Sequence, residues 1–302
     1  MLKKLKKTIS APILMIFVLL LLYLMKTVGS GTLTKGNVTL SIVALQIFIL
    51  VLPSFLYIKL FSDGIGKQMR LRWIRPSGVG FLIALFVLLV SGSVLIRTGV
   101  YYLFRPETMT SGGVFSASSD SLSFWELSFA LALVPALTEE FLFRGVLLSE
   151  YAHSGSAVAA VSVSLFFAFS HFDLISLPVY FFGGLIFAFA VYVTESLFAS
   201  VFLHFFYNLF SLFFEDDVWS IILRTTSPIF FVFIVIIFFF LSLLFTLRLA
   251  ERIEYKKGVD GMESPPEEKR CYYGVRSWTE SLLSPTFLIC VAFYLIAQLI
   301  LP

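Results

Sequence analysis

Long apolar runs alternate with short polar breaks along the whole chain. A helix that crosses a bilayer needs about 20 predominantly apolar residues, and nine segments approach or exceed that length. They are residues 9–26, 38–61, 78–100, 123–149, 156–173, 175–194, 196–214, 227–249 and 284–301. The fifth and seventh are short, and charged residues interrupt the fourth. This pattern predicts an all-α fold, a polytopic transmembrane bundle of about eight or nine helices.

The composition supports a membrane protein and excludes several other classes. Hydrophobic residues make up 59% of the chain and charged residues 14%, with a mean hydropathy of +0.95, whereas soluble domains carry about 25% charged residues. The two cysteines, Cys271 and Cys290, lie in no CxxC or Cys/His cluster, so they predict no disulfide framework. There is no Gly-rich phosphate loop. We therefore expect the lipid bilayer as a partner and no nucleic acid.

The basic residues predict the orientation of the chain in the membrane. If the N-terminus is cytoplasmic, sixteen Lys and Arg residues lie on that side and five lie outside, as the positive-inside rule requires. The first segment follows the basic start MLKKLKK and has features of a signal peptide. Its length and the lack of a clear Ala-x-Ala site favour an uncleaved anchor. The prediction is an N-terminus in the cytoplasm and, if all nine segments span, a C-terminus outside.

Five ionisable residues of the fourth, fifth and seventh segments stand out, because such residues are unusual within apolar segments. They are Glu139, Glu140, Arg144, His171 and His204. Such residues cost roughly 2.5–3.5 kcal/mol each on insertion scales, so they usually face a protein interior and have a function there. The alternative is a buried polar network that only holds helices together.

Helical spacing assigns different partners to the two adjacent glutamates. Glu140 and Arg144 are four residues apart, on one helix face and within ion-pairing reach. Glu139 has no cation at the corresponding position, so it needs a partner from another helix. His204 and Asn208 are also four apart and share a face, as do Phe167 and His171.

The distances of these residues from the cytoplasmic ends of their helices predict that they lie at a similar level in the membrane. At a rise of about 1.5 Å per residue, Glu139 lies roughly 15 Å and His204 roughly 12 Å from the predicted cytoplasmic ends of their helices. His171 lies roughly 22 Å from its own. Three antiparallel helices can bring these groups to one level. We expect a polar cavity that opens toward the cytoplasm between the fourth, fifth and seventh segments.

A glutamate, two histidines and a carboxamide suit hydrolysis. Carboxylate and imidazole can deprotonate a water molecule, and a second imidazole with an amide N–H can stabilise an oxyanion. Alternatively, Glu139, His171 and His204 form a His₂Glu set, which is a catalytic zinc arrangement. The sequence has no HExxH motif, no GxGD motif and no aspartate deep in a predicted span, which disfavours other intramembrane protease chemistries.

Three motifs, taken in order on three membrane segments, resemble those of the CPBP family of intramembrane proteases. This family includes the CAAX-processing (Rce1-type) endopeptidases and bacterial abortive-infection-type members. The motifs are Glu139-Glu140-x-x-x-Arg144, Phe167-x-x-x-His171 and His204-x-x-x-Asn208. The resemblance covers roughly residues 123–214.

The resemblance implies a role for each motif residue. Glu139 would be the general base, acting on water with His171, and His204 and Asn208 would stabilise the oxyanion. Supporting positions fall to Glu140, Arg144 and Phe167. The family's mechanism favours no metal and no other cofactor, with zinc on Glu139, His171 and His204 as the alternative.

The resemblance also implies a domain organisation and a setting. Residues 1–122 would form three N-terminal helices, 123–214 the catalytic core of the fourth to seventh helices, and 215–302 two C-terminal helices with a polar cytoplasmic loop at 250–283. The acidic stretch Glu215-Asp216-Asp217 would lie in an outer loop with no part in catalysis. The substrate would be a membrane-associated protein or peptide, and the compact chain is typical of a multi-pass protein of a prokaryotic plasma membrane.

Two rival functions use the same residues differently. One is a non-catalytic membrane protein, such as an immunity factor that acts by binding. The other is a proton-coupled transporter, because intramembrane Glu and His also form proton relays. A transporter is expected to show internal repeats, and none is visible in the sequence.

Overall fold

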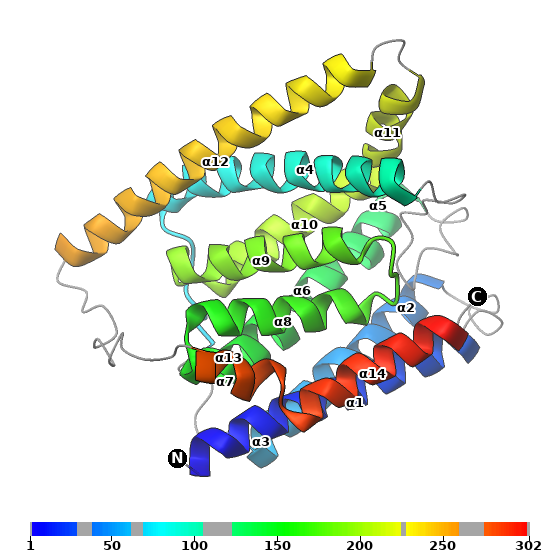
Figure 1. Cartoon of the computed structure of the whole chain (residues 1–302), viewed down its shortest axis with the longest axis vertical. Helices are drawn as coiled ribbons and strands as arrows, with labels where there is room; N and C mark the ends of the chain where they lie inside the picture. Colours follow the sequence, from blue (N-terminus) through cyan, green and yellow to red (C-terminus); the bar gives the residue numbers. More distant parts are fainter. Residues whose placement is uncertain are drawn as a thin grey trace.

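A computed structural model describes residues 2–28, 38–61, 69–104, 123–224, 228–259 and 275–300, and all regular secondary structure in these ranges is helical. The helices lie roughly side by side as a bundle, with α1 and α14 at one edge and α12 at the opposite edge (Figure 1). The α-helices are α1 (Leu2–Val28), α2 (Val38–Gln46), α3 (Leu52–Phe61), α4 (Pro76–Phe104), α5 (Phe124–Leu127), α6 (Val134–Glu140), α7 (Leu148–Tyr151), α8 (Ser156–Ser170), α9 (Leu177–Thr194), α10 (Leu197–Phe213), α11 (Glu215–Arg224), α12 (Pro228–Val259), α13 (Val275–Leu282) and α14 (Pro285–Ile300). Wider or tighter turns join some of them, namely the π-helical η2 (Ile47–Val51), η5 (Ser128–Leu133) and η6 (Phe141–Leu147) and the 3₁₀-helical η7 (Ala152–Ser154).

Five helical stretches are long and apolar enough to cross a membrane. They are Ser10–Thr27, Thr39–Phe61, Pro76–Phe104, Leu177–Thr194 and Ile229–Lys257, and α13 with α14 gives a sixth if that pair, bent by 50°, is one span. Two shorter apolar helices, α8 and α10, match the short fifth and seventh segments of the sequence pattern. The chain is therefore an integral, multi-pass membrane protein, whereas the predicted count of eight or nine helices stays a prediction.

Each predicted segment contains helix, but two regions differ from expectation. The fourth segment is broken into α-helical and π-helical pieces from Phe124 to Tyr151. The predicted polar loop at 250–283 is too long, because α12 continues to Val259 and α13 occupies Val275–Leu282. Ion pairs one turn apart stabilise this polar helix end, as between Lys257 and Glu254 at 2.7 Å. Residues 260–274 lie outside the described ranges.

The periphery and the centre of the bundle have different surfaces. In an 18-residue window of the Ile229–Lys257 stretch only 11% of the residues are buried. The phenylalanines Phe230, Phe233, Phe238, Phe240 and Phe245 of this stretch are exposed, and α12 forms one edge of the bundle (Figure 1). In a bilayer such a surface contacts lipid tails. The centre is dense where α8 meets α9: a Cβ added at Gly184 would lie 2.8 Å from the Cβ of Ser164. Only glycine permits this close approach, which positions the α9 backbone for the site described below.

The first predicted segment is an integral element of the bundle. Ala11, Met15, Val18 and Leu19 of α1 are fully buried, and α1 packs along α14 (Figure 1). The buried thiol of Cys290 donates to the carbonyl of Pro12 at 3.4 Å. This packing suits the predicted uncleaved anchor. Cys271 lies outside the described residues.

Candidate active site

The two adjacent glutamates end a short α-helix between two π-helical segments. Helix α6 lies between η5 and η6, and it carries both Glu139 and Glu140 in its last turn. π-Helical turns inside α-helices are frequent at functional sites. The prediction for this region assumed a regular α-helix, whereas η6 places Arg144 on a wider turn. Regular α-helical spacing therefore does not by itself determine the contacts of Arg144.

Arg144 pairs with Glu140, as its spacing predicts. Its Nη1 lies 2.8 Å from Oε1 of Glu140, and both side chains are 0% exposed. Nη2 donates to the carbonyl of Gly184 at 3.0 Å, and the guanidinium lies over the rings of Phe167 at 4.7 Å and Phe187 at 5.1 Å. Arginine is held in one position by an anion, a carbonyl and two aromatic faces. The contacts of Arg144 with Gly184 and Phe187 could not be predicted from helical spacing.

His204 contacts the same carboxylate, a link that the sequence did not predict. Its Nδ1 lies 2.9 Å from Oε1 of Glu140. A carboxylate only accepts hydrogen bonds, so Nδ1 carries the donated proton. The ring of Phe187 stacks on the imidazole, with centroids 4.7 Å apart and planes at 21°. Glu140 thus joins α6 to α10 and fixes the orientation of His204.

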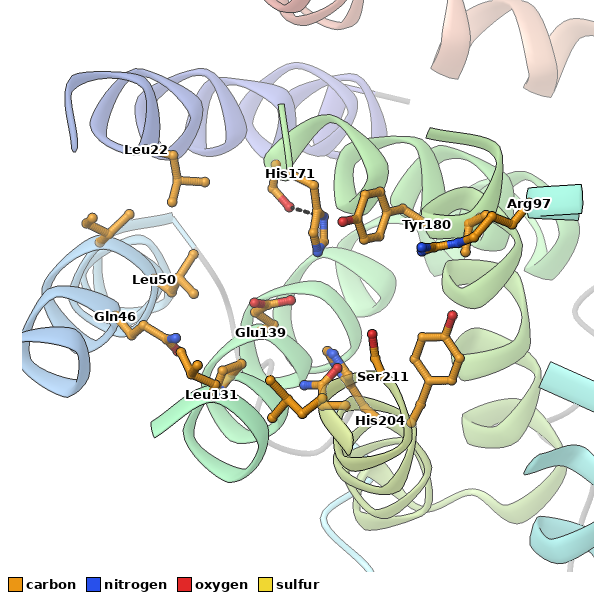
Figure 2. A pocket seen from close by; sticks show the side chains of 17 residues that line it. Leu22, Gln46, Leu50, Arg97, Leu131, Glu139, His171, Tyr180, His204 and Ser211 are labelled. Atoms are coloured by element: carbon orange, nitrogen blue, oxygen red, sulfur yellow. Dashed lines mark hydrogen bonds between the residues drawn. The ribbon is translucent and has the colours of Figure 1, made fainter. Parts of the chain in front are cut away.

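Glu139 faces a cavity that it shares with the other predicted catalytic residues. The cavity has a volume of about 170 Å³, and Glu139, His171, His204 and Asn208 all line it. Figure 2 shows Glu139, His171 and His204 around this space, with Tyr180 against His171. Oε2 of Glu139 is buried and has no hydrogen-bond partner in the part of the chain that the structure describes. A buried, unsatisfied carboxylate oxygen is rare and suggests that it binds something that enters the cavity.

His171 is oriented by two contacts. It lies just beyond the last residue of α8, and its Nδ1 is 2.8 Å from the carbonyl of Phe167. Because a carbonyl only accepts, Nδ1 donates, and Nε2 of the neutral ring is left as an acceptor. Tyr180 stacks on the imidazole with centroids 3.8 Å apart and planes at 20°. Sequence reasoning missed Tyr180, whose only signal is a tyrosine near the start of an apolar segment.

Asn208 is positioned by the π-helical turn. Its Nδ2 donates to the carbonyl of Ala132 in η5 at 3.4 Å, a long hydrogen bond. An amide nitrogen has two hydrogens, so one remains for a ligand in the cavity. The contact links α10 to the same broken helix that carries Glu139.

The cavity extends beyond the predicted catalytic core. Leu22 of α1, Gln46 and Leu50 of the second segment and Arg97 of α4 also line it (Figure 2). Helices that precede residue 123 therefore complete the walls, so residues 123–214 alone do not enclose the cavity.

If the N-terminus is cytoplasmic, the cavity extends toward the outer ends of its helices and not toward the cytoplasmic ends, where the opening is predicted. Leu22, Arg97 and Ser211 lie toward the C-terminal ends of helices that would run outward. Tyr180 lies near the N-terminal end of α9, which would run inward. Glu139 lies near the middle of the broken segment Phe124–Tyr151 and His204 near the middle of α10, so the four residues named above lie on the outer side of them. The depth estimates fixed the level of the two residues but not the direction in which the cavity extends.

The acidic stretch at 215–217 also differs from its prediction as an outer loop. Glu215 is 7% exposed and begins α11. Its Oε1 lies 2.8 Å from Nη2 of Arg97, and it accepts a hydrogen bond from the hydroxyl of Ser211. Both partners line the cavity. Glu215 is therefore a buried partner of the cavity wall rather than a solvated loop residue.

The sequence left open a zinc site formed by Glu139, His171 and His204. In the described ranges, no three His, Cys, Asp or Glu side chains lie close enough together to hold a metal ion. Nδ1 of His171 and Nδ1 of His204 each contact a protein oxygen, so Nε2 is the ring nitrogen left to a ligand in both. The three side chains line one cavity, and the zinc alternative stays a prediction.

Comparison with known proteins identifies the same segment. Residues 121–210 match the family model described as type II CAAX prenyl endopeptidase Rce1-like. This range contains every predicted site residue and agrees with the predicted core at 123–214. No significant match was found among curated proteins or among solved structures. The chain is thus a multi-pass membrane protein in which one segment, residues 121–210, is similar to the Rce1-like type II CAAX prenyl endopeptidases.

Proposed function

We propose that this protein is an intramembrane endopeptidase of the CPBP type, which hydrolyses a peptide bond of a membrane-associated protein or peptide. The observation that carries the proposal is the unpartnered Oε2 of Glu139 beside a cavity lined by two histidines and a carboxamide. These are the groups that hydrolysis of an amide requires, and they lie in the segment that matches the Rce1-like family model.

Water activation falls to Glu139 and His171. A water molecule in the cavity donates hydrogen bonds to Oε2 of Glu139 and to Nε2 of His171, the two acceptors that the protein leaves open. Its oxygen attacks the scissile carbonyl carbon as one proton moves to the carboxylate. The same proton is then delivered to the leaving amine, and the C–N bond breaks. The carboxylate is regenerated, so the reaction consumes only water.

Stabilisation of the oxyanion falls to His204 and Asn208. The second N–H of the Asn208 amide is one donor. Nε2 of His204 donates as well when the ring carries a proton on both nitrogens, and the carboxylate of Glu140 orients that ring through the 2.9 Å contact at Nδ1. Arg144 holds that carboxylate in place.

The proposed mechanism uses no metal. It predicts that purified protein holds less than stoichiometric zinc and keeps its activity in strong chelators. Loss of activity with a chelator, restored by added zinc, would contradict the mechanism and give Glu139, His171 and His204 ligand roles.

The setting we propose is a prokaryotic plasma membrane with the N-terminus in the cytoplasm. In that orientation the cavity lies in the outer half of the bundle, as described above. The substrate is then a membrane-anchored or membrane-embedded chain that presents an extended stretch from the outer side.

The direct test is a comparison of membrane proteomes from cells that produce wild-type protein or the Glu139→Gln variant. We expect at least one membrane-associated polypeptide to accumulate uncleaved in the variant, with its cleaved form only in the wild type. Glu251→Gln is a matched control, because Glu251 is an exposed glutamate of α12 far from the cavity. Identical proteomes for wild type and Glu139→Gln would overturn the proposal and favour the non-catalytic binding function.

A further inference from the structure

A second cavity lies at the opposite end of the bundle from the candidate active site. Its volume is about 490 Å³, and it is formed where α4 begins and where α9 and α12 end. In Figure 1 these three helix ends lie on the left. The active-site cavity is lined by Arg97 and Tyr180, which lie toward the opposite ends of α4 and α9. Nothing in the proposed hydrolysis uses this second cavity.

The lining of the second cavity is strongly basic. Arg72, Arg75, Lys256 and Lys257 line it together with one acidic residue, Glu195, so four positive charges and one negative charge leave a net charge of +3. The Glu195 carboxylate contacts Arg72 at 3.3 Å and Lys257 at 3.4 Å. Lys257 also pairs with Glu254, which is not part of the lining, at 2.7 Å, whereas Lys256 has no hydrogen-bond or ion-pair partner within the described ranges. The pocket therefore has spare positive charge for an anion.

The backbone around this pocket is held in place before any ligand binds. Leu197 N–H donates to the carbonyl of Arg70 at 2.9 Å, and the Ser196 hydroxyl donates to the carbonyl of Arg72. The ring of Trp73 stacks on Phe198, with centroids 4.8 Å apart and planes at 11°. These contacts fix the stretch before α4 against the turn between α9 and α10. A preorganised site loses less conformational entropy when it binds.

The pocket lies at the level of the lipid head groups. Three apolar stretches, Pro76–Phe104, Leu177–Thr194 and Ile229–Lys257, each have one end at its rim. Trp73 is 81% exposed beside it, and exposed tryptophans are typical of the membrane–water interface. By the positive-inside rule this end is the cytoplasmic one. Basic pockets between transmembrane helices on that side bind anionic head groups, and arginine suits the geometry of a phosphate.

We propose that this pocket binds the phosphate of an anionic phospholipid head group, with Arg72, Arg75, Lys256 and Lys257 as its cationic walls. The acyl chains then lie along the apolar surface below the pocket. The inference is independent of the proposed hydrolysis, because it rests on a separate cavity.

The test uses the full chain purified in a neutral detergent, with bound lipid measured by native mass spectrometry. The probes are phosphatidylglycerol, phosphatidylcholine and inorganic phosphate. The pocket variant is Arg75→Gln with Lys256→Gln, and its control is Arg248→Gln with Arg252→Gln, which removes the same charge from exposed positions of α12 outside the pocket. Each Lys or Arg near the membrane surface contributes about 1 kcal/mol to the binding of an anionic lipid, and about 1.4 kcal/mol corresponds to a tenfold change in affinity. Losing two cations should therefore weaken phosphatidylglycerol binding roughly 30-fold.

The expected result is tight phosphatidylglycerol binding by the wild type and the control, and weak binding by the pocket variant. Equal loss in both variants would show that only the general charge of this end matters and would overturn the proposal. So would equal binding of phosphatidylcholine, or binding of inorganic phosphate as tight as that of the lipid. If the double variant does not fold, Lys256→Glu alone serves the same purpose, because its side chain makes no described polar contact and its negative charge should repel the phosphate.

Discussion

Replacing Glu140 by glutamine should destabilise the fold, although the change is isosteric. The Glu140 Oε1 atom accepts from Arg144 Nη1 at 2.8 Å and from His204 Nδ1 at 2.9 Å. A glutamine oxygen can still accept both bonds but has no charge. Hydrogen bonds to charged groups contribute roughly 1.5–3 kcal/mol and neutral ones roughly 0.5–1.5, so two weakened bonds lose about 2–3 kcal/mol.

A second effect acts in the same direction. Arg144 is 0% exposed, and the variant leaves its charge buried without an anion. Removing one partner of a buried ion pair costs roughly 3–5 kcal/mol. Because glutamine retains the hydrogen-bond geometry, we place the loss at the lower end, about 3 kcal/mol in the free energy of unfolding.

The neighbouring substitution Glu139→Gln is the matched control, with the opposite expectation. The Glu139 Oε2 atom is buried without a partner in the described part of the chain. Neutralising an unsatisfied buried carboxylate removes a desolvation penalty, so the free energy of unfolding should stay the same or rise. Hydrolysis should nevertheless be lost, because the base is gone.

The measurement is unfolding of the purified variants by SDS titration in mixed micelles, followed by tryptophan fluorescence. Glu140→Gln should unfold at clearly lower SDS than the wild type, and Glu139→Gln at the same SDS or higher. The division of roles between the two glutamates is refuted if both variants are destabilised to the same extent, or if Glu140→Gln is within about 1 kcal/mol of the wild type, which is the effect of an average mutation.

Three further outcomes follow from other contacts. Gly184→Ala should destabilise the protein by about 1–3 kcal/mol through overpacking against α8, whereas Gly183→Ala, whose added Cβ would be 3.8 Å from its nearest neighbour, should unfold like the wild type. Glu215→Gln should lower the free energy of unfolding by about 2 kcal/mol because its partly buried partner Arg97 loses its anion, while neutralising the exposed Glu251 of α12 should change it by no more than about 0.5 kcal/mol. A single cysteine at Leu131, in a chain without its two native cysteines, should react with a membrane-impermeant thiol reagent from the outer side, and reaction only from the cytoplasmic side would contradict the proposed orientation.

The sequence by itself determined the features that depend on local periodicity. Apolar runs of spanning length predict helices because a bilayer requires satisfied backbone hydrogen bonds, and the observed helices follow those runs closely. The pairing of Glu140 with Arg144 could be predicted because both residues lie on one helix, four positions apart. The three motifs likewise led to the Rce1-like segment at 121–210. The roles of Glu139, His171, His204 and Asn208 remain proposals.

Tertiary structure decided the contacts that join residues from different helices. The link from His204 to Glu140, the stacking of Tyr180 on His171 and the pair of Arg97 with Glu215 each depend on how two helices rotate and pack against each other. Helical periodicity fixes which residues share a face, but not which neighbouring helix that face meets. For the same reason, depths counted along single helices placed Glu139 and His204 at one level but could not determine toward which helix ends the cavity extends. Its walls are completed by α1, the second segment and α4, and only the packed bundle determines where those helices lie.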